Sequence, residues 1–129
     1  MSRYYYEVLE QLQKTTPDDP SVLAALGIKA TQEQDDAKAV EYLTRALQKG
    51  VHNVAAYIDL SDALAHMGRV EDSAKVLEQA VAVWPFRQQI KKALVFRYVT
   101  LKQFPQAREA LKQYVALFAR RRIYARPAG

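Results

Sequence analysis

The chain has 129 residues, half of them hydrophobic, and a formal net charge of +5 at pH 7. It contains no cysteine, which excludes disulfide frameworks, thiolate zinc sites and cysteine catalysis. It also lacks the apolar run of about 18 residues that a membrane span needs, and its length suits one domain that buries about two-thirds of its unfolded surface.

The positive charge is concentrated toward the C-terminus. Residues 1–84 contain 8 Lys and Arg against 13 Asp and Glu, whereas residues 85–129 contain 11 against 1. A solvated terminus is the simplest interpretation of this basic end. Its functional alternatives are attraction of an acidic protein segment and, without any dedicated motif, binding of nucleic acid or an anionic membrane surface. The basic end is represented by Arg87, Lys91, Arg120, Arg121 and Arg122.

Seven segments carry apolar residues at intervals of three and four, the pattern of amphipathic helices. The first contains Tyr5, Leu9 and Leu12, and the second runs from Ser21 to about Glu33. The later stripes cover residues 39–47, 57–64, 74–81, 94–101 and 107–118. No segment alternates as a β-strand does, so the sequence predicts an all-α fold.

Residues that begin and end helices stand between these stripes. Asp19 before Pro20 supplies an N-cap and a first-turn proline. Gly50 is placed to adopt the left-handed conformation that ends a helix, and Asn53 to cap the helix that follows. Gly68 stops the next helix. Because the connections between the stripes are short, we expect neighbouring helices to be antiparallel.

Two ladders of leucine share one spacing of 34 residues. The first ladder comprises Leu9, Leu43, Leu77 and Leu111. The second comprises Leu26, Leu60 and Leu94. A fixed period filled with helical pattern is the mark of a repeat protein, because each unit buries its apolar face only against its neighbours.

The repeat can be aligned residue by residue with a known signature. Leu26 followed by Gly27 is a good local match, and the segment 54–87 is the most complete copy. That copy holds Tyr57, Leu60, Ser61, Leu64, Ser73, Leu77, Ala80 and Pro85. These residues resemble the tetratricopeptide repeat family. The resemblance implies a right-handed superhelical solenoid of antiparallel helix hairpins, with about seven helices.

The register divides the chain into copies of different quality. We expect a single domain over residues 1–121, followed by a basic C-terminal tail at 122–129. Its parts are residues 1–19, a half repeat or capping helix; 20–53 and 54–87, two repeats; and 88–121, a degenerate terminal repeat. Because 1–19 fits only the second helix of a unit, a fragment of a longer array is one interpretation, and a native cap is the other.

The resemblance also implies a function: first helices of such repeats line a groove that receives a peptide or helix of a protein partner. Transferred by position, the groove contacts are Ala24, Ile28, Ile58, Asp59, Asp62, His66, Gln89, Lys92 and Phe96. Ala24 and Ile28 stand where the carboxylate-clamp subfamily needs Lys and Asn, so a terminal carboxylate is not the expected ligand. A basic group toward Asp59 and Asp62, and an acidic group toward Lys92, fit better.

Enzymatic chemistry finds no support in the sequence. Asp59, Asp62 and His66 lie on one helical face, but the only other histidine is His52, at a turn. No phosphate loop, nucleophile elbow or metal motif is present. We therefore expect no catalytic residue, no metal and no cofactor, and interpret His66 as a solvated partner of Asp62. The first residues lack a signal-peptide core, which favours the cytoplasm.

Self-association is the alternative function. The first helix carries exposed apolar and aromatic side chains at Tyr4, Tyr5, Tyr6, Val8 and Leu12. Copies stacked head to tail through this surface, or through the acidic and basic ends, would make a heterologous contact and form rings or filaments. The predicted partners are thus a protein, a peptide or a second copy, rather than nucleic acid.

Overall fold

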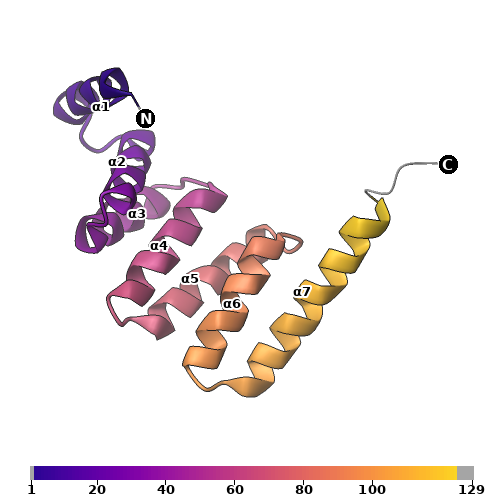
Figure 1. Cartoon of the computed structure of the whole chain (residues 1–129). Helices are drawn as coiled ribbons and strands as arrows, with labels where there is room; N and C mark the ends of the chain where they lie inside the picture. The colour runs from indigo at the N-terminus through magenta and orange to yellow at the C-terminus, as the bar shows by residue number, and fades with distance from the viewer. Residues whose placement is uncertain (1, 125–129) are drawn as a thin grey trace. The chain divides into compact units, whose positions relative to one another are not determined.

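The computed structural model describes the backbone of residues 2–124 and the side chains of residues 2–119. These residues form seven α-helices and no strand (Figure 1), which confirms the all-α prediction. The helices are α1 (Arg3–Thr15), α2 (Pro20–Gln32), α3 (Asp36–Gln48), α4 (Val54–His66), α5 (Val70–Val83), α6 (Gln88–Thr100) and α7 (Phe104–Tyr124).

The chain divides into two compact units, Met1–Arg69 with α1 to α4 and Val70–Gly129 with α5 to α7. In the first unit α2 and α3 make the most extensive contact, α4 packs on α3, and α1 packs on α2. In the second unit α6 packs against both α5 and α7. The division falls inside the predicted repeat 54–87. Helix α7 also continues into the segment expected as a tail, as far as Tyr124, while residues 125–129 lie outside the described part.

The predicted helix caps are confirmed. The Asp19 carboxylate accepts hydrogen bonds from the backbone N–H groups of Ser21 at 2.9 Å and Val22 at 3.1 Å. The Asn53 side-chain oxygen accepts from the Ala55 N–H at 2.8 Å. These bonds satisfy backbone donors that have no partner within the first turn of a helix, so they fix where α2 and α4 begin.

Each turn between a first and a second helix contains one residue in the left-handed region. These residues are Gln34, Gly68 and Lys102, with φ of 59°, 80° and 59°, and they stand one repeat apart. The next residue in each case donates its N–H back to a carbonyl five residues earlier. The three bonds are Asp35 to Ala30 at 2.9 Å, Arg69 to Leu64 at 2.8 Å and Gln103 to Tyr98 at 2.8 Å. This is the Schellman pattern of helix termination.

Glycine is expected to stabilise two of these turns. A side chain in the left-handed region costs roughly 1–2 kcal/mol, and the extra freedom of glycine in the unfolded chain offsets about half of that. Gln34→Gly and Lys102→Gly should each raise the free energy of unfolding by about 0.5–1 kcal/mol, measured by urea denaturation. Gln79→Gly, on the exposed surface of α5, is the control and should lower it by about 1 kcal/mol. Destabilisation by both turn variants would contradict this account.

The first leucine ladder forms the core of the helix pairs except at its last member. Leu9 is 5% exposed and Leu43 and Leu77 are fully buried, but Leu111 is 48% exposed. The small residues that the repeat places opposite the ladder are buried too: Ala39, Ala46, Ser73, Ala80 and Ala107. Helices approach closely where these small side chains lie.

One close approach lies between α2 and α3, where Gly27 faces Leu43. A Cβ atom added to Gly27 would lie 2.5 Å from Leu43 Cδ2 and 3.3 Å from the Leu43 backbone nitrogen. Real Cβ atoms essentially never come within 3.0 Å of another heavy atom. The second helix of this hairpin therefore occupies the space that any larger residue at position 27 needs.

Candidate functional site

The predicted groove residues of the first unit lie on α2 and α4, two first helices that contact each other. Ile28, Ile58, Asp59 and Asp62 are partly buried, so they are candidates for a surface with both apolar and acidic side chains. Ala24 does not belong to it: Ala24 is 7% exposed and packs in the core with Leu23 and Ala46. We therefore define the α2–α4 surface as Ile28, Ile58, Asp59 and Asp62.

The α2–α4 surface contains two carboxylates, Asp59 and Asp62, one helical turn apart. Partial burial, and secondarily the negative charge of Asp62, raise the pKa of Asp59 above its ordinary value of 3.8. The ionised form of Asp59 is therefore less favourable here than in water. A positive group placed beside it would stabilise the ionised form and so counteract the rise in the pKa of Asp59.

His66 lies at the end of α4 and contacts a different residue from the one expected. Its Nδ1 lies 3.3 Å from an Asp36 carboxylate oxygen, across the gap to α3. The sequence interpretation paired His66 with Asp62, because residues four apart on a helix are neighbours. The contact that the structure gives instead joins two helices, and a local spacing rule does not reveal it. Among the described residues, no group of His, Asp and Glu is arranged to hold a metal ion.

The remaining predicted groove residues lie on α6, in the second unit. Gln89 and Lys92 are exposed, and Phe96 is 58% exposed. Their α6 surface thus offers a large apolar ring and a cation. We describe it separately from the α2–α4 surface.

The aromatic run of α1 is the candidate surface for self-association. Tyr4 is 75% exposed, and Tyr5, Val8 and Leu12 are between 37% and 42% exposed. Tyr6 is less exposed, and the centroid of its ring lies 5.4 Å from the Lys29 ammonium of α2. Beyond Tyr6, Val8 and Leu12 are therefore partly accessible to solvent, whereas Leu9 between them is buried against α2.

Two side chains of the basic end, those of Arg87 and Lys91, lie in the described part of the structure. Arg87 is exposed at the start of α6. Lys91 is partly buried, and its ammonium donates a hydrogen bond to the Gln113 side-chain oxygen at 2.5 Å. The side chains of Arg120, Arg121 and Arg122 lie outside the described part of the structure.

Within the helices described, none is long and apolar enough to cross a membrane.

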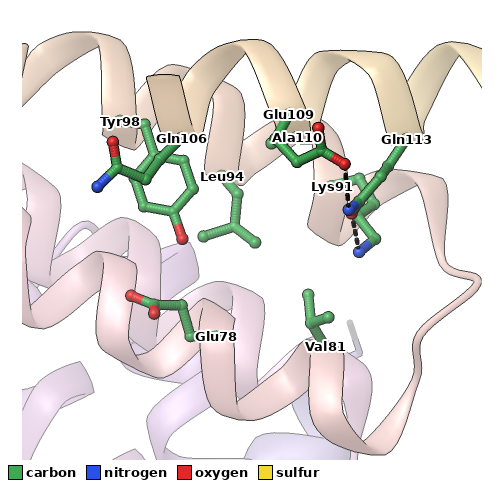
Figure 2. Close-up of a pocket in the computed structure, with 9 residues that line it drawn as sticks. All are labelled: Glu78, Val81, Lys91, Leu94, Tyr98, Gln106, Glu109, Ala110 and Gln113. Carbon is green, nitrogen blue, oxygen red and sulfur yellow. Dashed lines mark hydrogen bonds between the residues drawn. The ribbon is translucent and has the colours of Figure 1, made fainter. Parts of the chain in front are cut away.

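A cavity in the second unit was not foreseen. It has a volume of about 340 Å³ and lies among α5, α6 and α7 (Figure 2). Tyr98 and Glu78 face each other at one end, and burial together with the charge of Glu78 raises the pKa of Tyr98. Gln113 links the other end, accepting from Lys91 and donating to Glu109 at 3.3 Å.

Comparison with known proteins assigns this geometry to a repeat family. The sequence model of the tetratricopeptide repeat matches residues 30–94, half of the chain. No curated protein sequence matches. Among solved structures, MamA AMB-1 is similar over 88% of this chain and 62% of its own, with a TM-score of 0.80 and 24% identity. This chain therefore spans less than two-thirds of that MamA chain.

A second MamA structure and a chain from a larger complex give the same result. MamA MSR-1 is similar over 88% of this chain and 66% of its own, with a TM-score of 0.79 and 24% identity. A chain of the APC/C hetero-tetramer Cut9–Hcn1 matches 87% of this chain and 23% of its own, with a TM-score of 0.75 and 20% identity. At these identities the likeness concerns the fold.

Proposed function

Because the chain belongs to the tetratricopeptide repeat family, we propose that it is a non-enzymatic module that binds a segment of a partner protein on its first helices. The α2–α4 surface receives the segment, with apolar side chains against Ile28 and Ile58 and a Lys or Arg beside Asp59 and Asp62. On α6, Phe96 and Lys92 supply a second contact surface, suited to an apolar and an acidic side chain. The module works within a larger scaffold.

The acidic pair on the α2–α4 surface is the observation that carries this proposal. Burial and Asp62 raise the pKa of Asp59, so keeping this carboxylate ionised at neutral pH destabilises the unliganded protein. A cation from a partner offsets that cost at the same place where Ile28 and Ile58 offer apolar contact. Charge complementarity of this kind chiefly sets specificity and association rate.

Asp59→Asn should raise the stability of the unliganded protein at neutral pH, although it removes the charge that the proposed partner cation would contact. Because the folded-state pKa is raised, the unfavourable contribution of Asp59 is fully present above that pKa and disappears as the pH falls below 3.8. The variant should therefore be more stable than wild type at pH 7, by less than about 1 kcal/mol for a half-exposed group. The gain should vanish at pH 3, and thermal denaturation at both pH values measures it. Glu41→Gln, an exposed carboxylate on α3, is the control without a gain.

Peptide selection tests the binding half of the proposal. Random 12-residue peptides displayed on phage and selected with the wild-type protein should become enriched in Lys or Arg next to apolar residues. The Asp59→Lys, Asp62→Lys double variant should lose these peptides. Selection of the same sequences by both proteins would show that the α2–α4 surface is not the site.

Self-association is a second candidate function, supported by the exposed apolar face of α1. Head-to-tail contact would give a mass that increases with concentration, up to a fixed multiple for a ring and without a limit for a filament. Light scattering after size exclusion measures that mass. A constant 14.7 kDa at all concentrations removes this candidate and leaves the peptide-binding proposal untouched.

A further inference from the structure

Helix α7 carries an apolar stripe that faces solvent. Phe104, Leu111, Val115 and Phe118 are between 48% and 55% exposed. They stand 7, 4 and 3 residues apart, so they follow one face of the helix. Single exposed apolar residues are ordinary, but a continuous stripe of four large ones marks an interaction site.

The repeat shows what kind of element belongs on this stripe. The residues equivalent to Leu111 are Leu9, Leu43 and Leu77, which are almost fully buried. In each case the helix that follows packs against the helix that carries the leucine: α2 against α1, α4 against α3, and α6 against α5. In the described part of the chain no helix follows α7. The stripe is therefore the face on which the fold elsewhere seats an α-helix.

The charges beside the stripe indicate the chemistry of that helix. Arg108 and Lys112, four residues apart and both exposed, line one shallow hollow of α7 together with Leu111 and Val115. Glu109 also borders the hollow, but its carboxylate accepts a hydrogen bond from Gln113, away from the stripe. A helix seated on the stripe thus meets two cations along its edge.

We propose that this face of α7 binds an amphipathic α-helix of another protein that carries Asp or Glu beside its apolar stripe. We call this exposed surface the α7 face. It consists of Phe104, Leu111, Val115 and Phe118, with Arg108 and Lys112 at its edge. The apolar side chains of the partner fill the hollow, and its carboxylates lie against the two cations. A second copy of α7 fits less well, because it would bring the same cations together.

Two synthetic helical peptides test the proposal. Both have about 18 residues with leucines at alternating intervals of three and four; one has Glu on each side of the leucine stripe, the other Lys. Fluorescence anisotropy at low salt should give about tenfold tighter binding of the Glu peptide. The Arg108→Glu, Lys112→Glu variant should reverse the preference, so that the Lys peptide binds tighter.

Further variants separate the α7 face from other apolar surfaces. Leu111→Ser with Val115→Ser should weaken both peptides at least tenfold and, because both residues are half exposed, leave the circular dichroism spectrum unchanged. Met67→Ser, a similarly exposed residue of the first unit, should change nothing. Equal binding of both peptides, an unreversed preference after charge exchange, or a dimer that the serine variant abolishes would each overturn the proposal. The α2–α4 surface plays no part in these measurements, so the two sites fail or succeed separately.

Discussion

Replacing Leu43 with alanine is expected to lower the free energy of unfolding by about 2–5 kcal/mol. Leu43 is fully buried between α3 and its neighbours, so the truncation removes apolar contacts and leaves a cavity that the surrounding helices fill incompletely. Urea denaturation followed by circular dichroism measures the change.

The same truncation at the end of the ladder is the matched control. Leu111→Ala removes the same atoms from a residue that is 48% exposed, so it should cost less than about 1 kcal/mol. Equal losses at the two positions would mean that Leu111 is covered in the free protein. That result would also remove the basis for a vacant α7 face.

Gly27→Ala should lower the free energy of unfolding by up to about 2 kcal/mol, although alanine is the better helix former. Helix propensity favours the change by about 1 kcal/mol. Against that, the new methyl group falls 2.5 Å from Leu43 Cδ2, and overpacking in a close-packed core typically costs about 1–3 kcal/mol. The new methyl group would also lie 3.3 Å from the Leu43 backbone nitrogen, a tight contact that rotation of the leucine side chain does not relieve. Thermal and urea denaturation both report the loss.

A double variant identifies the cause of that loss. In Gly27→Ala with Leu43→Ala, the shortened side chain leaves room for the methyl group, so the double variant should lose less than the sum of the two single changes. A coupling of about 1 kcal/mol or more is expected for residues in direct contact. Strict additivity would show that the methyl group is not obstructed by Leu43.

The fold could be predicted from the sequence because the apolar residues that determine it recur at regular intervals. The apolar spacing located all seven helices, and Asp19 and Asn53 marked two helix starts that the hydrogen bonds confirm. Gly50 was predicted to adopt the left-handed conformation and does so, and Gly68, predicted only as the end of a helix, is left-handed as well. These features depend on residues close together in the chain, for which local rules hold.

The surface could be predicted only in part, because exposure depends on distant neighbours. Ala24 was assigned to the groove by its repeat position, but its small side chain is buried by Ala46 of the next helix. His66 contacts Asp36, 30 residues away. Gln34 and Lys102 adopt the left-handed conformation without being glycine, so composition alone gave no sign of the recurring turn.

That recurring turn also marks where the number of repeats can change by recombination. Gln34, Gly68 and Lys102 occupy the same point of the same backbone turn. A deletion of residues 35–68 joins Gln34 to Arg69. The shortened chain still has, in this order, a first helix, a left-handed residue and a second helix. A duplication between the same points lengthens the array in the same way. The chain therefore contains crossover points at which gene rearrangement adds or removes a whole unit without creating a new kind of loop.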